Sequence, residues 1–482
     1  MHKAPSFSVI MEVTTPNIMR KERCLVTSIL SDFQDKIQTE SRVKRFLRLF
    51  KVLDLMNATG FAKIKGIPLL AVVHFLLELV FTHKNLFRIM NSHKDSVPFA
   101  KDTVYRLLND PRSDWRQLQL RLGGEIINNH LSPLTSEDRV SALVFDDSAY
   151  SRDRSKKVEL LARVKDHVTG RYFKGFRQLT GGWTDGATFI PLVSALLSSS
   201  KAENRLYEQG PDVPVNSPGE KRRKEALQSG TSLILDMLDQ ILVHVQSFRY
   251  VLFDSWFSWP EVIKGVKARQ RDVVCMLKDM PKIYYTYQEK PYRLSELYKV
   301  VAKQNGKRPY IASVIVDYYG LPARIVFVRN RNDKKSREWL ALLSTDIEVS
   351  EEEIIRIYGL RWDIEVFFKM CKSFLRLAKE FQSRSYDAMV AHTTIVCIRY
   401  MMLAVENREQ KDSRAHGELF YLFCDEVADL DFTQAFMYIL DLFTQTLREH
   451  LFLSESMLNH ILTAFMEKLP GFIHDRLLLN AA

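Results

Sequence analysis

Two short apolar segments that each end on aspartate constrain this chain more than any other feature. Ser141–Phe145 reads SALVF and stops at Asp146, and Tyr250–Phe253 reads YVLF and stops at Asp254. Such runs predict buried strands, and in an open sheet the carboxyl ends of parallel strands face the functional crevice. If the strands are neighbours, the aspartates lie side by side and repel each other unless a cation lies between them. The alternative is that each aspartate begins a turn or caps the next helix.

The composition narrows the chemistry of such a site. Five cysteines are dispersed without a CxxC pair, and twelve histidines form no HxH or HxxxH cluster. Any metal would therefore be held by carboxylates, which suits Mg²⁺. The net charge of +11 suits a polyanionic partner if it is concentrated on one face. No apolar run reaches the roughly 18–20 residues of a membrane span, and the N-terminus lacks a signal-peptide core. We therefore expect a protein of the reducing cytoplasm, neither membrane-bound nor secreted.

The chain of 482 residues is too long for one ordinary core, so two or three domains are expected. Residues 24–135 read as helices and suit either a DNA-binding or a helical packing domain. From residue 140 the pattern changes to strands. We expect the polar stretch 198–230, with the basic run 221–224 (KRRK), to be a mobile loop, and helices to return in the last hundred residues.

Residues 351–375 (EEEIIRIYGLRWDIEVFFKMCKSFL) predict one amphipathic helix. At about 100° per residue, Tyr358, Arg361, Glu365 and Lys372 share one face. The opposite face is apolar and consists of Leu360, Ile364, Phe367, Cys371, Phe374 and Leu375. The alternative is an exposed helix with ordinary i,i+4 ion pairs such as Glu365 with Lys369.

The spacing Tyr358-x2-Arg361-x3-Glu365-x6-Lys372 resembles the YREK signature of the insertion-sequence-4 family of DDE transposases. The resemblance implies an α/β fold: an RNase H-like mixed sheet flanked by helices, whose first and fourth strands carry the aspartates, with an inserted mainly β domain and helical N- and C-terminal regions. The implied divisions are a helical N-terminal DNA-binding region (1–135), the first part of the RNase H-like core (136–262), the inserted domain (263–346), the core helix with the motif (347–380) and a helical C-terminal region that is a candidate for dimerisation (381–482).

The same resemblance implies phosphoryl transfer on DNA with two Mg²⁺ ions, for which Mn²⁺ would substitute. The catalytic and metal-binding carboxylates would be Asp146, Asp254 and Glu365. The family's first aspartate usually appears as Asp-x-Thr or Asp-x-Ser, which favours Asp146 over Asp147, although both stay open.

The resemblance also assigns contacts with DNA. Arg361 and Lys372 would grip phosphates beside the cut, and Tyr358 would hydrogen-bond a phosphate near the DNA end. Trp339 would stack on a flipped base, or else belong to a β core. We expect Trp256 and Trp259, beside Asp254, to serve packing. Four cations after the first aspartate either line the DNA channel or form an ordinary charged hairpin: Arg152, Arg154, Lys156 and Lys157.

The expected function is that of a cut-and-paste transposase. It would act in the bacterial cytoplasm, associated with the nucleoid, on double-stranded DNA that comprises the inverted-repeat ends and the target, as a homodimer on paired ends. Two alternatives remain: a related RNase H-like nuclease, and a non-catalytic or domesticated DNA-binding protein. An acidic cluster on a DNA-facing surface counts against the last of these unless it binds metal.

Overall fold

The computed structural model describes residues 41–62, 66–92, 97, 99–136, 138–166, 170–208, 210, 212–302, 309–329, 339–380, 383–409, 414–451 and 453–478. The first 40 residues, which contain the start of the predicted N-terminal region and the segment inspected for a signal peptide, lie outside the described residues. The chain forms two compact units. Unit 1 comprises Met1–Lys51, Lys63–Val104 and Gly417–Ala482, and unit 2 comprises Val52–Ala62 and Tyr105–His416.

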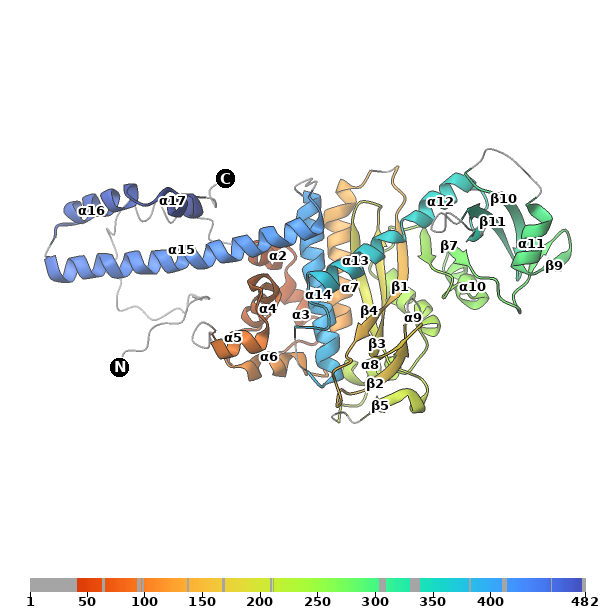
Figure 1. Cartoon of the computed structure of the whole chain (residues 1–482), viewed down its shortest axis with the longest axis horizontal. Coiled ribbons are helices and arrows are strands. Elements are labelled where there is room, and N and C mark those ends of the chain that lie inside the picture. Colours follow the sequence, from red (N-terminus) through yellow and green to blue (C-terminus); the bar gives the residue numbers. More distant parts are fainter. Residues whose placement is uncertain are drawn as a thin grey trace. The chain divides into compact units, whose positions relative to one another are not determined.

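Unit 2 is built on a mixed sheet, which among the described residues has 12 strands in the order β5-β2-β3-β1-β6-β7-β12-β11-β10-β8-β9, with β4 paired to β3 (Figure 1). The strands are β1 (Ala142–Ser151), β2 (Leu161–Lys165), β3 (Tyr172–Thr184), β4 (Phe189–Leu197), β5 (Arg205–Tyr207), β6 (Tyr250–Phe253), β7 (Asp272–Leu277), β8 (Tyr285–Tyr287), β9 (Lys290–Tyr292), β10 (Ala312–Tyr318), β11 (Leu321–Arg329) and β12 (Trp339–Ser344). The pairs β1–β6 and β6–β7 are parallel, and the other pairs are antiparallel.

Helices cover this sheet. The helices of unit 2 are α3 (Val52–Asn57), α7 (Trp115–Glu125), α8 (Pro218–Ala226), α9 (Gly230–Leu242), α10 (Pro260–Ala268), α11 (Leu294–Val301), α12 (Glu351–Gly359), α13 (Trp362–Ser373) and α14 (Tyr386–Glu409), with the shorter turns η3 (Ile126–Leu131), η4 (Ser132–Leu134) and η5 (Ala202–Asn204). Helices α7 and α14 pack against β4, and α13 packs against β1 and β4. Strand β4 is buried at every position because helices enclose it, which explains its unbroken apolar sequence.

Helix α14 is, among the described residues, the one helix long and apolar enough to cross a membrane. Its most apolar 18-residue window is 94% buried in the folded chain.

Unit 1 is helical in its described part. It contains α2 (Arg42–Leu49), α4 (Leu69–Glu78), η1 (Leu79–Thr82), α5 (Leu86–Ser92), α15 (His416–Leu451), α16 (Glu455–Glu467) and α17 (Gly471–Leu478), and α6 (Lys101–Leu108) crosses the division between the units. The second and third of its chain segments share one core, since the ring of Phe81 lies 5.5 Å from Phe420 and 5.1 Å from Phe423. The backbone amide of Arg42 also donates to Glu426 at 2.6 Å.

The polar stretch 198–230 differs from the expectation of a mobile loop, because it contains η5, β5 and α8. The basic run lies on α8, where two of its four cations are used internally. Arg223 donates to Glu159 at 2.6 Å and to Asp387 at 2.7 and 2.9 Å. Arg222 is buried and donates to the carbonyls of Pro111 and Ser113, each at 3.1 Å. The polar composition of this stretch suggested a loop. The stretch is ordered instead because Arg222 and Arg223 pair with buried acceptors.

Candidate functional site

Asp146 and Asp254 stand on neighbouring parallel strands. The register pairs Phe145 with Phe253, so each aspartate follows the last paired residue of its strand pair. Both phenylalanines are fully buried. Because successive side chains along a strand point to opposite faces, each aspartate points away from the side on which the preceding phenylalanine is buried. The adjacency that the two apolar runs suggested is therefore present in the fold.

The electrostatics of this pair reflect burial and mutual repulsion. Burial raises the pKa of Asp146 to about 7; Arg361 opposes the rise and the charge of Asp254 adds to it. Burial also raises the pKa of Asp254, against the Trp256 amide, which donates to the Asp254 carboxylate at 2.9 Å, and against Arg361. Two carboxylates that both resist ionisation are a pair that a nearby cation would stabilise.

Asp147 faces a different partner. Its carboxylate receives both Nε (2.7 Å) and one Nη of Arg177, so it is locked in a bidentate ion pair. Its backbone amide donates to Asp146 at 2.8 Å. The structure thus gives the two neighbouring aspartates separate environments, with Asp146 turned toward Arg361 and Asp147 toward Arg177.

The helix expected over residues 351–375 is interrupted. Helix α12 ends at Gly359 and α13 begins at Trp362, and the amides of Leu360 and Arg361 bond three residues back instead of four. Glycine weakens a helix by about 1 kcal/mol relative to alanine, which favours the break here. Tyr358 therefore lies on α12, and Glu365 and Lys372 on α13, with Arg361 at the junction.

Arg361 connects two of the predicted carboxylates. One Nη donates to Asp146 Oδ2 at 2.8 Å and the other donates to Glu365 Oε1 at 3.0 Å. The Arg361 side chain is 16% exposed, whereas that of Glu365 is 43% exposed. The guanidinium also lies 5.9 Å from the ring centre of Tyr358, whose pKa is raised by burial. A single cation thus links Asp146, Glu365 and Tyr358.

Lys372 lies one helical stretch further along α13 and donates to Ser148 Oγ at 2.6 Å. Ser148 is two residues after Asp146 on the same strand, so the ammonium lies beside the same edge of β1. Burial lowers the pKa of Lys372, and Asp166 opposes this effect. Lysine and arginine together place two cations along the carboxylate pair.

Helix α13 is held in place at its start and along its buried face. Thr184 Oγ1, at the end of β3, donates to Asp363 at 2.5 Å. In the following turn Gly186 adopts φ +81°, and a Cβ at that position would lie 3.1 Å from the side chain of Leu360. Phe367 packs on Phe189 of β4 at 5.3 Å, which fixes the helix on the sheet. The apolar face predicted for this helix is therefore what orients its polar face.

Trp339 lies at the start of β12 in an aromatic cluster. It stacks on Tyr298 at 4.6 Å with an interplanar angle of 24° and meets Phe327 edge-on at 5.2 Å. None of these described contacts involves the carboxylates. By contrast Trp256 and Trp259, which we expected to serve packing, are 48% and 43% exposed just after Asp254. Their position in the sequence, directly after an aspartate that ends a strand, was the feature from which this exposure beside the site could have been predicted.

The donor set partly fits a divalent metal. Asp146 and Asp254 offer neighbouring carboxylate oxygens of the kind that Mg²⁺ prefers. Within the described ranges, however, no group of three or more His, Cys, Asp or Glu side chains could hold an ion. Glu365 is instead engaged by Arg361. The two aspartates fit a metal, and Glu365 would need to change partners to join them.

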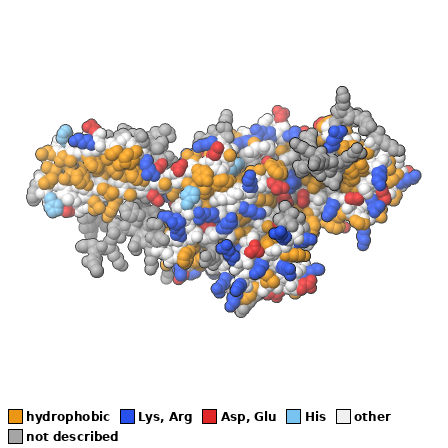
Figure 2. Space-filling view, in the orientation of Figure 1, with side chains coloured by type: hydrophobic (Ala, Val, Ile, Leu, Met, Phe, Trp, Pro, Cys, Tyr) orange, Lys and Arg blue, Asp and Glu red, His pale blue; other side chains and the backbone are white. Residues whose placement is uncertain are grey.

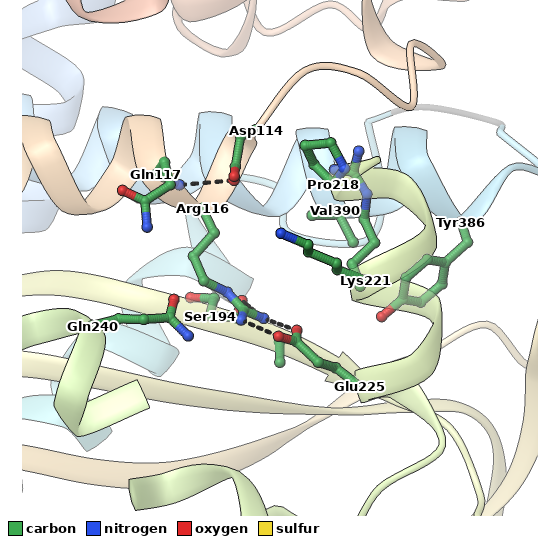
Figure 3. Close-up of a pocket in the computed structure, with 12 residues that line it drawn as sticks. Asp114, Arg116, Gln117, Ser194, Pro218, Lys221, Glu225, Gln240, Tyr386 and Val390 are labelled. Carbon is green, nitrogen blue, oxygen red and sulfur yellow. Dashed lines mark hydrogen bonds and ion pairs between the residues drawn. The ribbon is translucent and has the colours of Figure 1, made fainter. Parts of the chain in front are cut away.

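The cavity in Figure 3 is a separate feature. It measures about 200 Å³, lies among α7, β4, α8, α9 and α14, and is lined by none of the predicted site residues. Its main polar contact is the ion pair of Arg116 with Glu225, at 2.5 and 2.8 Å. This cavity therefore belongs to the packing of helices on the sheet.

Two family models match the chain. One is described as a DDE superfamily endonuclease and covers residues 81–296; the other is described as a transposase DDE domain and covers residues 228–402. The first match contains Asp146 and Asp254, and the second contains Asp254 and the motif from Tyr358 to Lys372. No curated protein matches the chain.

Among solved structures, the chain is similar to one described as "Cryo-EM structure of piggyBac transposase synaptic complex with hairpin DNA". The similarity has a TM-score of 0.44 and 12% sequence identity, and it covers 84% of this chain and 83% of that one. The two family models support a DDE transposase.

Proposed function

We propose that this chain, for which the family matches support a DDE transposase, catalyses cut-and-paste transposition by cleaving DNA at inverted-repeat ends and joining the freed ends to target DNA. The observation that carries the proposal is the junction of Asp146, Asp254, Arg361 and Glu365. This junction combines carboxylates that suit phosphoryl transfer with a guanidinium that can bind phosphate in a bidentate way. The fold brings these groups together although Arg361 and Asp146 lie more than 200 residues apart in the sequence.

The sheet supports an RNase H-like core. Strands β5 and β2 form one end of the sheet and β8 to β12 the other. Between them the chain runs through β1, β3, β4, β6 and β7, and the spatial order is β4-β3-β1-β6-β7. Asp146 and Asp254 then stand on the first and fourth strands, which is the placement that such a core requires. The motif also agrees in spacing with the insertion-sequence-4 family.

Enzymes of this class normally use divalent metals. Asp146, Asp254 and Glu365 would hold them, as Mg²⁺ with Mn²⁺ as a substitute, and the bound ions would activate the attacking oxygen and stabilise the leaving oxygen. The chain's own part is to keep both aspartates at one edge of the sheet and to free Glu365. Because Arg361 hydrogen-bonds Glu365 at an exposed position, a DNA phosphate that binds this guanidinium would release the glutamate.

Lys372 and Tyr358 complete the proposed phosphate contacts. The ammonium of Lys372 has a single hydroxyl as its described hydrogen-bond partner, Ser148, so a phosphate could replace it without breaking an ion pair. The Tyr358 hydroxyl stays protonated because its pKa is raised, and it can therefore donate to an anion. Trp339 keeps its proposed stacking role only if its contact with Tyr298 is given up.

The proposed enzyme acts as a homodimer on paired ends in the bacterial cytoplasm. Figure 2 shows hydrophobic side chains gathered over the part of the surface that α15 and α16 occupy. On α15, Ile439 is 61% and Leu442 47% exposed. A second copy would bury such a face. Light scattering tests the proposed homodimer, first without DNA and then with the DNA ends added. A chain that is still monomeric when the DNA ends are bound would exclude the homodimer.

The test of the proposed function is cleavage of a duplex that carries the inverted repeat flanking the gene. Wild-type protein should nick this duplex only with Mg²⁺ or Mn²⁺, and Glu365→Gln should abolish nicking while DNA binding stays intact. Glu352→Gln is the matched control, because Glu352 is an exposed glutamate on the neighbouring helix α12. Binding without any metal-dependent cleavage by the wild type would instead favour the non-catalytic alternative.

A further inference from the structure

A basic hairpin lies next to the candidate site. It comprises the loop after β1 and the strands β2 and β3, and Figure 2 shows Lys and Arg side chains gathered over this part of the surface. Its exposed cations are Arg154, Lys156, Lys157, Arg163, Lys165, Arg171 and Lys174. Arg152, which was grouped with them in the sequence, has a different role, since it donates to the carbonyls of Ala378 and Ser383 at 3.1 and 2.9 Å.

The strand register concentrates these charges on one face. Arg163 pairs with Lys174, and Lys165 pairs with Tyr172, so three cations and a tyrosine project together while Val164 turns to the buried side. The Arg163 guanidinium stacks over the Tyr172 ring at 4.9 Å, although that ring is 58% exposed. Like charges directly opposite each other destabilise a sheet. The fold therefore carries an electrostatic cost on this face that a bound polyanion would offset.

Two interactions link the hairpin to residues beside the carboxylate pair. Arg177, which holds Asp147, also donates from Nη1 to the carbonyl of Lys165 at 3.2 Å. Asp166, at the end of β2, acts electrostatically on Lys372. Strand β3 can pass this close to β1 because Gly175 has no side chain; a Cβ there would lie 2.1 Å from the carbonyl of Tyr150. The charged face of the hairpin therefore lies next to the carboxylate site.

We propose that this hairpin face is the surface that holds the phosphate backbone of duplex DNA beside the cleaved bond. The proposal rests on the proposed function for its substrate, and it assigns the grip on flanking DNA to residues outside the Tyr358–Lys372 motif. Arg163, Lys165 and Lys174 contact phosphates without reading sequence. The stacked pair of Arg163 and Tyr172 presents a flat cation, which suits a phosphate oxygen and the adjacent sugar.

The test measures binding of a random-sequence 40-base-pair DNA duplex in EDTA, as a function of salt. The variant Arg163→Gln/Lys165→Gln/Lys174→Gln should lower the slope of log K against log salt by about 2 to 3, because each lost phosphate contact removes about 0.9. Its melting temperature should stay close to that of the wild type, since the loss of repulsion between Arg163 and Lys174 offsets the loss of the Arg163–Tyr172 stacking. An unchanged slope would overturn the proposal.

The matched control carries the same change of charge elsewhere in unit 2. Lys264→Gln/Lys290→Gln/Lys299→Gln replaces three exposed lysines on α10, β9 and α11, and it should leave the slope within about 1 of the wild type. An equal fall of the salt slope in this control would show that binding depends on net charge and would overturn the assignment to the hairpin. The assignment would also be overturned if the hairpin variant lost affinity for duplex RNA but kept its affinity for duplex DNA.

Because no metal is present in this assay, the DNA-binding role of the hairpin and the proposed catalytic function can be excluded independently of each other. A normal slope in the hairpin variant, together with metal-dependent cleavage by the wild type, would exclude the hairpin alone. A reduced slope without any cleavage would exclude the enzyme alone.

Discussion

Arg361 and Asp146, 215 residues apart in the sequence, form a hydrogen-bonded ion pair of 2.8 Å where the parallel pairing of β1 with β6 ends. The guanidinium therefore sits next to the carboxylate pair at which a metal cation would be expected. It is stabilised there by Glu365 and by the ring of Tyr358. In the DNA-free chain, Arg361 and a divalent metal would compete for the same oxygens.

Removing this arginine should strengthen metal binding in the absence of DNA. Arg361→Gln deletes charge-assisted hydrogen bonds to Asp146 and Glu365, each contributing about 1.5–3 kcal/mol. We expect the affinity for Mn²⁺ to rise by about tenfold or more in titration calorimetry at pH 8.5, an alkaline pH chosen because burial raises the pKa of Asp146. Arg356→Gln on α12, which removes a helix-surface arginine paired with Glu353, is the control and should have no effect. Unchanged affinity in Arg361→Gln would refute the competition.

The two neighbouring aspartates should separate in their effects. Asp146→Asn removes a carboxylate from the site and should abolish cleavage, with folding stability retained or increased because burial disfavours the Asp146 charge. Asp147→Asn breaks a bidentate ion pair with Arg177 and should lower stability by about 1–3 kcal/mol while some cleavage remains. Urea unfolding and nicking assays on both variants check this. The reverse pattern would make Asp147 the catalytic residue.

The turn between β3 and β4 should position the α12–α13 junction. In Gly186→Ala, the φ of +81° costs about 1–2 kcal/mol, and the added Cβ presses on Leu360 beside Arg361. We expect cleavage to slow by about tenfold. Gly320→Ala is the control, because Gly320, in the β10–β11 turn, has φ +86° and open space around its Cβ position. It should lose similar stability but keep its cleavage rate, and equal slowing in both variants would exclude the positioning role.

Stability should fall on the acid side through His392 on α14. Burial lowers the pKa of His392 to about 3, so the folded chain binds fewer protons than the unfolded chain between pH 3 and 6.5. The stabilisation is complete above pH 6.5 and is lost as the pH falls toward 3, by about 2 kcal/mol at pH 5. Compared with His392→Asn, the wild type should lose this amount in urea unfolding between pH 7 and pH 5. A pH-independent difference would contradict the assignment.

The sequence predicted those parts of the site that depend on local pattern. Apolar runs closed by aspartate located the two neighbouring parallel strands, because burial on both faces demands such runs. Asp254 does follow the end of β6, but the expected strand end at Asp146 was wrong, because β1 continues to Ser151 where it pairs with β3. Helical periodicity also predicted the buried face of α13, including Ile364 and Phe367.

The rest depends on contacts between distant segments. Gly359 favours the helix break locally, but the proximity of Leu360 to Gly186 in the β3–β4 turn is a contact that periodicity does not encode. The ordered helix α8 depends on the pairing of Arg223 with Glu159 and Asp387, far away in the sequence. The ion pair of Arg361 with Asp146 likewise has no local signature, since charge spacing along one helix predicts i,i+4 partners only.

Unit 1 takes its core from both ends of the described chain, and this sets the order of events during synthesis. Phe81 meets Phe420 and Phe423 only after about 340 more residues have been translated, roughly 17–70 s at typical ribosome speeds. Unit 2 can complete its sheet within that interval. The segment that leaves the ribosome early must therefore wait for its partners with apolar helices unburied, so the order in which the two units finish folding is the reverse of the order in which they begin to be made.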